Sequence, residues 1–387
     1  MLSKIHRRTK RIKDLVLYMI KNRNGKKSAA AMNVSKPIWL FSERGNDARD
    51  NGYWMFKYVT EHHPEISAYY VIDRKSADYD KVAALGKTVQ PGSALHYALM
   101  YAAEALISTH DSGYTPDMVL YHHMYNYGLF KPKGKRIFLQ HGIMDKDVSW
   151  YYRKNFKPDM FVVSNTAERD IILKYFNQPE KNIMMTGLPR YDTLSNMFQR
   201  NMILVMPTWR QYLVTCSEEE FRQSEYFKFY DSLLHSGVIA GILDRYGYDM
   251  IFYPHIEMQR FHAFSSDNPR ITVADFENYD VQALLKQASI LVTDYSSVYF
   301  DVAYMEKDIV FAHFDRSDYE GRHYNACLLD YDQFGTVTKT LQETESAIEE
   351  ALINPGRKQE EQNEFFYYHD SENCRRVYEA IRDVIRE

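Results

Sequence analysis

Cysteine is scarce in this 387-residue sequence: Cys216, Cys327 and Cys374 lie far apart and form no Cys-x-x-Cys pair. Such spacing argues against a disulfide framework or a zinc site, and it fits a reducing compartment. Long apolar runs are also missing. The longest run near the N-terminus covers residues 15–20, which is too short to span a bilayer, and no small-residue cleavage site follows it as a signal peptide requires.

Motifs of several common enzyme classes are absent too. The sequence contains no dinucleotide-binding GxGxxG, no P-loop GxxxxGK[ST] and no zinc-binding HExxH. Oxidoreductases, P-loop kinases and metalloproteases of the familiar kinds therefore lose support. No metal site is predicted and no cofactor is certain, although the sequence leaves a divalent cation such as Mg²⁺ open.

What the chain does contain is a charge asymmetry. Residues 1–27 hold ten Lys or Arg and one acidic residue, a balance of +9; because the whole chain carries −4, the other 360 residues carry −13. The apolar residues of the basic segment fall near one face of a helix, namely Ile5, Ile12, Leu15, Val16 and Met19. We predict that residues 1–35 form a basic amphipathic helix on an anionic membrane surface.

Two alternatives exist for this segment, a solvated helix and a nucleic-acid-binding arm. The acidic remainder of the chain offers nucleic acid no continuous basic footprint, so we expect no nucleic-acid partner.

The length favours two domains, and the 45% hydrophobic and 15% aromatic content is ample for their cores. From Pro37 onward, short apolar runs alternate with amphipathic segments, which is typical of parallel sheets covered by helices. Strands are predicted within residues 38–42, 68–73, 105–110, 136–141, 160–165 and 183–187, and then within 202–209, 249–255, 270–275, 290–297 and 308–315. A polar linker, residues 187–201, separates the two series. We predict an α/β fold of two Rossmann-like domains that face a cleft.

Polar residues follow several predicted strands, at the edge where open α/β sheets bind ligands. His141 ends a strand of the first domain, and Gly142 leaves room for an acceptor beside it. A neutral imidazole there can take a proton from a hydroxyl, with Asp145 or Asp147 as its orienting partner. The alternative is a strand end that happens to be His. Weaker acceptor-side candidates in this domain are Gly45, Asn46, Asn51 and Asp111.

The second domain offers a phosphate site. Asp294, Ser296 and Ser297 close a buried strand just before a helix, whose free N–H groups and two hydroxyls suit a diphosphate. Simple N-capping is the alternative. His255 ends another strand and can donate a hydrogen bond to a phosphate oxygen or protonate it. The first strand of this domain adds two donor-phosphate candidates, Thr208 and Arg210.

Six segments, in this order, resemble the CDP-glycerol glycerophosphotransferases of teichoic acid and capsule synthesis: "FLQHG", "SNTAERDIILKYF", "GLPRYDTL", "MPTWR", "YPHIEM" and "LLKQASILVTDYSSVYFDVA". The resemblance implies a glycosyltransferase-B architecture. It places an acceptor-binding domain at residues 36–195, a CDP-alcohol-binding domain at 196–355 and C-terminal helices at 356–387. It also implies that His141 is the base, that His255 contacts the donor phosphates and that both serines hold the diphosphate.

The implied reaction moves glycerol phosphate, or ribitol phosphate, from CDP-glycerol or CDP-ribitol to a hydroxyl of a lipid-linked saccharide, and it releases CMP. Such an enzyme is expected to be peripheral, at the cytoplasmic face of the bacterial cell membrane. The alternatives are a nucleotide-sugar glycosyltransferase of the same fold that acts on a cell-envelope glycan, a sugar-nucleotide epimerase and a non-enzymatic membrane scaffold. Loop 42–52 matches the family only loosely, and the donor alcohol stays open.

Overall fold

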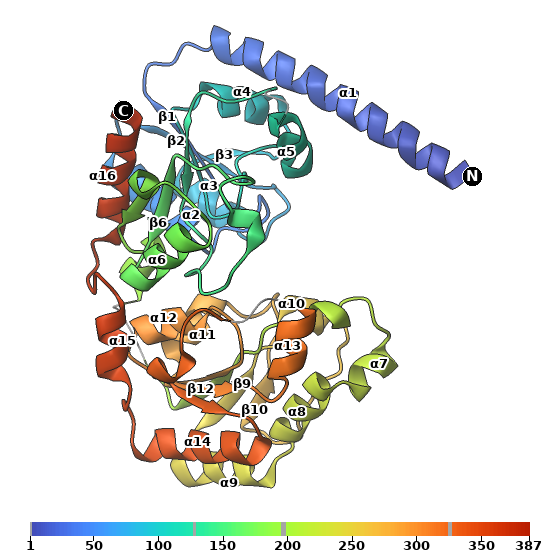
Figure 1. Cartoon of the computed structure of the whole chain (residues 1–387), viewed down its shortest axis with the longest axis vertical. Coiled ribbons are helices and arrows are strands. Elements are labelled where there is room, and N and C mark those ends of the chain that lie inside the picture. The colour runs from blue at the N-terminus through green and yellow to red at the C-terminus, as the bar shows by residue number, and fades with distance from the viewer. Residues whose placement is uncertain (1, 127–128, 195–198, 324–326) are drawn as a thin grey trace.

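The computed structural model describes residues 2–126, 129–194, 199–323 and 327–387, which form two lobes (Figure 1). Each lobe is built on a sheet of parallel strands, seven in the order β3-β2-β1-β4-β5-β6-β7 and six in the order β10-β9-β8-β11-β12-β13. In both sheets the strand order reverses beside the first strand, between β1 and β4 and between β8 and β11. Open α/β sheets bind ligands at this reversal, beyond the carboxyl ends of the strands.

The strands of the N-terminal lobe are β1 Ile38–Ser42, β2 Ser67–Val71, β3 Lys87–Val89, β4 Ala105–Ser108, β5 Lys135–Phe138, β6 Met160–Val163 and β7 Ile183–Met185. Those of the C-terminal lobe are β8 Met202–Val205, β9 Asp249–Phe252, β10 Ile271–Val273, β11 Ile290–Thr293, β12 Asp308–Ala312 and β13 Thr336–Thr338. The predicted two-domain α/β architecture is confirmed. The sequence missed two strands, β3 and β13, which are edge strands of three residues each.

The helices of the N-terminal lobe are α1 Leu2–Ala31, α2 Asn51–His62, α3 Tyr79–Leu85, α4 Ala94–Ala102, α5 Met118–Asn126 and α6 Thr166–Lys174, with the 3-10 turns η1 Ser149–Tyr151, η2 Glu180–Asn182 and η3 Pro189–Thr193. The C-terminal lobe contains η4 Gln211–Leu213, α7 Glu218–Gln223, α8 Glu225–Leu234, α9 Gly237–Tyr246, α10 Ile256–Gln259, α11 Val281–Gln287, α12 Tyr299–Tyr304, α13 Arg316–Arg322, η5 Tyr331–Gln333 and α14 Leu341–Ile353. The last two helices are α15 Gln359–Phe365 and α16 Asn373–Arg386.

Both faces of the sheets are buried, which explains their apolar strands. In β1, Trp39 and Phe41 pack with residues of α2 and α16 on one face, whereas Ile38 and Leu40 pack with residues of α1 and α4 on the other. In β8, Leu204 likewise faces a different core from its two neighbours. Successive side chains of a strand point to opposite faces, so a strand covered on both sides reads as a continuous apolar run.

The C-terminal helices connect the lobes. Helix α15 packs on α12 of the C-terminal lobe, whereas α16 returns to the N-terminal lobe and packs on α2 and η3 (Figure 1). The Asp192 carboxylate accepts hydrogen bonds from the backbone N–H groups of Asn373 and Cys374 at 2.7 and 2.8 Å, and it thereby caps the start of α16.

The first part of the polar stretch predicted as a linker contributes to the interior of the protein. Its η3 turn is part of the interior, because Arg190 and Tyr191 are both buried. The polar composition had suggested an exposed segment. Arg190 can nevertheless be buried because carboxylates of both lobes neutralise its charge, as described below.

Helix α1 docks on α4 by one face. Gly25 allows the close approach, since a Cβ at this position would lie 2.6 Å from the Cβ of Tyr97. Tyr18 and Asn22 are buried on the same side, while the first turns of the helix extend beyond the lobe (Figure 1). Among the described residues, no helix combines the length and apolar character that crossing a membrane requires.

Candidate active site

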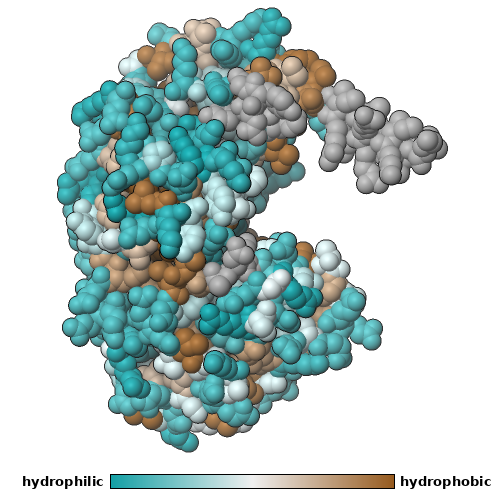
Figure 2. Space-filling view, viewed as in Figure 1, coloured by the Kyte–Doolittle hydropathy of each residue, from teal (hydrophilic) through white to brown (hydrophobic). Residues whose placement is uncertain are grey.

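A cavity of about 530 Å³ separates the two lobes, and Figure 2 shows the hollow between them. Its volume lies within the range of roughly 300–1,000 Å³ that is usual for ligand pockets. The reversal points of both sheets open onto it. The N-terminal lobe contributes Glu43, Arg44, Asp50, His110, His141 and Arg190, and the C-terminal lobe contributes Thr208, Trp209, His255, Ser296, Ser297 and Asp301.

His141 lies directly after the turn that ends β5, with 56% of its side chain exposed. The preceding residue, Gln140, has φ +63°, a left-handed backbone that non-glycine residues rarely adopt. Its buried side chain donates a hydrogen bond to the Glu168 carboxylate at 2.8 Å, and its carbonyl accepts one from Asn51 at 2.9 Å. These contacts hold the strained turn, which brings the imidazole to the cleft.

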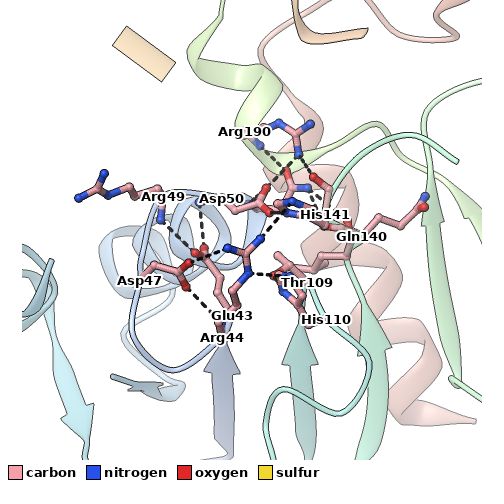
Figure 3. A network of polar contacts seen from close by, with 12 residues as sticks. Glu43, Arg44, Asp47, Arg49, Asp50, Thr109, His110, Gln140, His141 and Arg190 are labelled. Carbon is pink, nitrogen blue, oxygen red and sulfur yellow. Dashed lines mark hydrogen bonds and ion pairs between the residues drawn. The ribbon is translucent and has the colours of Figure 1, made fainter. Parts of the chain in front are cut away.

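Asp50, the residue before α2, orients this imidazole. Its Oδ2 lies 2.5 Å from His141 Nδ1 (Figure 3). Because a carboxylate can only accept, Nδ1 carries the proton and Nε2 keeps its lone pair. Burial by itself would raise the pKa of Asp50, but the charge of Arg190 and the hydrogen bond from His141 lower it well below the usual value. The carboxylate stays ionised and holds the tautomer that a general base needs.

Arg190 links this pair to the other lobe. Its guanidinium donates to Asp50 Oδ1 at 2.9 Å and to the His141 carbonyl at 3.0 Å. It also donates hydrogen bonds to both carboxylate oxygens of Asp301, at 2.9 and 2.6 Å. Asp301 belongs to α12, the helix that follows the two serines. One buried arginine therefore sets the spacing across the cleft.

His255 ends β9 on the opposite side and shows the complementary tautomer. The backbone N–H of Glu257 donates to its Nδ1 at 3.3 Å, so the neutral ring carries its proton on Nε2. Burial, followed by the charges of Arg44 and His141, lowers the pKa of His255 to about 4. At neutral pH this ring is a hydrogen-bond donor and not an acid.

The two rims meet at Ser297. A Cβ on Gly142 would lie 3.0 Å from the Ser297 hydroxyl, so a larger residue would crowd the serine. At the start of α12, the cap residue Val298 makes no side-chain hydrogen bond, and the Ser296 hydroxyl accepts a long one from the backbone nitrogen of Val298, at 3.5 Å. Both hydroxyls border the cleft beside His141.

The sequence matches the CDP-Glycerol:Poly(glycerophosphate) glycerophosphotransferase family over residues 27–383. The chain belongs to this family. It is 30% identical to the minor teichoic acid biosynthesis protein GgaB of Bacillus subtilis over 369 residues. The aligned region covers 90% of this chain and 40% of GgaB. It is 25% identical over 268 residues to the teichoic acid poly(glycerol phosphate) polymerase of Bacillus spizizenii, 59% of this chain and 62% of that protein. The chain thus spans less than two thirds of these relatives.

Solved structures share the fold. The wall teichoic acid polymerase TagF matches with a TM-score of 0.70 and 17% identity, over 100% of this chain and 99% of the other. MnaA of S. aureus, solved with UDP, matches with a TM-score of 0.55 and 11% identity, over 91% and 97%. The glycerophosphotransferase fold of this chain is therefore the two-lobed fold predicted from its sequence.

Two predicted phosphate contacts need correction. Arg210 and Asp294 are completely buried. The guanidinium pairs with Asp294 at 3.0 Å and with both oxygens of Asp315 at 2.7 and 2.9 Å. Asp294 in turn accepts from the backbone N–H groups of Thr208 and Tyr295 at 2.8 and 2.6 Å. This network joins the ends of β8 and β11 beneath the cleft, and Thr208 and Tyr295 are its members that border the cleft.

None of the four weaker acceptor-side candidates borders the cleft. The carbonyls of Gly45 and Asn46 accept hydrogen bonds from the loop after β2, so this part of the β1 loop turns away from the cleft. Asn51 is fully buried, where it donates to the Gln140 carbonyl and accepts from Arg190 N at 3.0 Å. Asp111 is also buried, and its Oδ2 lies 3.0 Å from His122 Nε2.

The predicted partners of His141 are wrong as well. Asp145 pairs with Lys146 at 2.9 Å, and Asp147 accepts from the Tyr152 hydroxyl at 2.7 Å. Asp50 lies in loop 42–52, to which the sequence assigned no orienting role, and Arg190 lies in the stretch predicted as a linker. The described residues bring together no three His, Cys, Asp or Glu side chains that could hold a metal ion.

Replacing Asp50 by Asn tests the imidazole tautomer. An amide N–H at this position donates to Nδ1 and moves the proton to Nε2, which removes the lone pair. We expect kcat to fall at least ~100-fold, the usual scale for a general base. Asp73→Asn, on an exposed loop of the same lobe, is the control and should keep wild-type turnover. A near-normal kcat in folded Asp50→Asn would exclude the orienting role.

Replacing Arg210 by Met tests its buried structural role. Loss of one partner leaves uncompensated buried carboxylates, which costs about 3–5 kcal/mol in free energy of unfolding. Arg270→Met is the matched control: this arginine forms surface pairs with Asp244 and Asp249, worth about 0–1 kcal/mol. Urea denaturation measures both. Unchanged stability together with lost donor affinity would restore Arg210 as a phosphate contact.

Proposed function

We propose that this chain transfers glycerol phosphate, or ribitol phosphate, from a CDP-alcohol to a hydroxyl of a lipid-linked acceptor in teichoic acid or capsule synthesis. The observation that carries the proposal is a pair of histidines with opposite tautomers on facing rims of one cleft. His141 offers a lone pair and His255 offers an N–H. Family membership supports CDP-glycerol as the donor.

In the proposed reaction the acceptor hydroxyl gives its proton to His141 Nε2. The oxygen forms a bond to the phosphorus that carries the alcohol, and the bond from this phosphorus to the bridging oxygen breaks. CMP leaves with that electron pair. The imidazolium formed is stabilised by the Asp50 carboxylate, while His255 and the two serines bind phosphate oxygens. Positioning and charge stabilisation are the main demands of such a transfer.

A direct test supplies a synthetic lipid-linked disaccharide with CDP-glycerol, CDP-ribitol or UDP-sugars and analyses the products by mass spectrometry. We expect alcohol-phosphate addition and CMP release, and a loss of at least ~100-fold in the His141→Ala variant. His62→Ala, an exposed histidine at the end of α2, should behave as wild type. Transfer from the UDP-sugar alone would establish a glycosyltransferase instead, and sugar-nucleotide turnover without acceptor would establish an epimerase.

A peripheral position on the cytoplasmic membrane face follows from a lipid-linked acceptor, and α1 supports it. One side of the helix is fixed on α4, while an apolar group with 40–51% exposure faces away: Val16, Leu17, Met19 and Ile20. Exposed Lys13, Lys21, Arg23 and Lys26 flank this group. An exposed apolar stripe with basic neighbours suits the boundary between anionic headgroups and acyl chains.

Sedimentation with phosphatidylglycerol vesicles tests this membrane contact. We expect the double substitution of Val16 and Ile20 by Asp to weaken vesicle binding at least ~10-fold, because buried apolar area and attraction to anionic lipid both fall. Val238→Asp, equally exposed on α9 of the other lobe, is the control. Transfer to a water-soluble acceptor should be unchanged. Unaltered vesicle binding by the double variant would remove α1 as the membrane contact.

A further inference from the structure

Arg44 occupies the middle of the polar network on the N-terminal rim (Figure 3). It follows β1, and half of its side chain is exposed. Its Nε donates to His110 Nε2 at 3.2 Å, and its Nη2 lies 3.5 Å from His141 Nε2. Its ion pair with Asp47 is long, at 3.7 Å. The shortest side-chain contacts of the guanidinium are therefore with two imidazoles, one of which belongs to the proposed base.

The other cations that border the cleft have close carboxylate partners. Arg49 pairs with Asp78 at 2.8 Å and Lys146 with Asp145 at 2.9 Å. Arg190 is neutralised by two carboxylates, as described above. Among the described cations that border the cleft, Arg44 has the longest contact to a carboxylate. Its charge is therefore the most readily available to an anionic ligand.

The imidazoles beside Arg44 are weak competitors for its N–H groups. His110 Nε2 accepts from the guanidinium, so its Nδ1 carries the proton and donates to Thr109 Oγ1 at 2.9 Å. Burial, followed by the charges of His141 and Arg44, lowers the pKa of His110 to about 3. This ring is neutral at physiological pH. Hydrogen bonds from a guanidinium to anionic oxygens are stronger than those to neutral acceptors.

We propose that Arg44 binds the donor phosphate that carries the alcohol, the group that is transferred. This inference rests on the proposed function of the cleft. In this arrangement the guanidinium lies over the lone pair of His141 Nε2. When a phosphate draws the guanidinium to its non-bridging oxygens, the lone pair is freed for the acceptor hydroxyl. The base is then exposed only after donor has bound, which protects the activated phosphate from premature attack by water.

The planar fork of arginine fits two phosphate oxygens, and the location fits the bond that breaks. Arg44 lies on the same rim as the base, and Ser297 touches this rim at Gly142. Burial and then the charge of Arg44 depress the pKa of His255, and both side chains border the same cleft. A phosphate held between His255 and the serines lies within this cleft.

Titrations with CMP and CDP test the assignment, because only CDP carries the second phosphate. Arg44→Ala should weaken CDP binding about 10-fold or more and leave CMP binding within about twofold, as expected when a charge-assisted contact to one phosphate is lost. Arg74→Ala, an exposed arginine after β2, is the matched control and should bind both nucleotides as wild type does. With CDP-glycerol, kcat of Arg44→Ala should fall about 100-fold, the scale of one lost oxyanion contact.

Added guanidinium ion should restore part of the turnover of Arg44→Ala and none of that of His141→Ala, an effect that a purely structural defect would not produce. Unchanged CDP affinity, or equal losses for CMP and CDP, would overturn the assignment. A change confined to KM for the acceptor would also overturn it and place Arg44 at the acceptor. A wild-type protein that binds neither nucleotide and transfers no alcohol phosphate would instead refute the proposed function itself.

Discussion

The geometry of the cleft depends on one buried guanidinium. Arg190 holds the carboxylate that orients His141 in one lobe and grips Asp301 at the base of α12 in the other. Burying such a charge costs desolvation energy, so buried ion pairs add little net stability, but removal of one partner is expensive. Its contribution is therefore positional: it fixes the distance between His141 and the helix that follows the two serines.

The two histidines show how the hydrogen-bond partner of one ring nitrogen sets the chemistry of the other. A carboxylate at Nδ1 leaves His141 with an outward lone pair, whereas a backbone N–H at Nδ1 leaves His255 with an outward proton. Burial keeps His255 neutral, so the donor side offers hydrogen bonds without a proton that could be transferred by mistake. The hydrogen bonds within the protein thus fix a lone pair on one rim and a proton on the other, an arrangement that is preorganised for the proposed reaction.

Sequence alone predicted the elements that leave a local trace. Strands covered on both faces appear as apolar runs, and His141, His255 and the two serines stand where those runs end. Asp50 and Arg190 leave no such trace, since the first lies 91 residues from its histidine and the second sits in a polar stretch that resembles a linker. Arg210 could be located at a strand end from the sequence, but its burial could not be predicted. That burial depends on Asp315, which lies 105 residues away in the sequence. For Arg190, the sequence signal that could have indicated burial was its position between Pro189 and Tyr191, next to Leu188.

The β1 loop carries both Arg44 and Asp50, and one buried carboxyl group, that of Glu43, shapes it. Glu43 accepts from the backbone N–H groups of Arg49, Asp50 and Tyr53 at 3.0, 3.0 and 2.8 Å. Gly52 lets α2 approach, since a Cβ there would lie 2.9 Å from Glu43 Cγ. Burial, followed by repulsion from Asp50 and Asp47, raises the pKa of Glu43 to about 8. Asp50 is thus held directly by Glu43, and Arg44, the proposed phosphate contact, is its neighbour in the same loop.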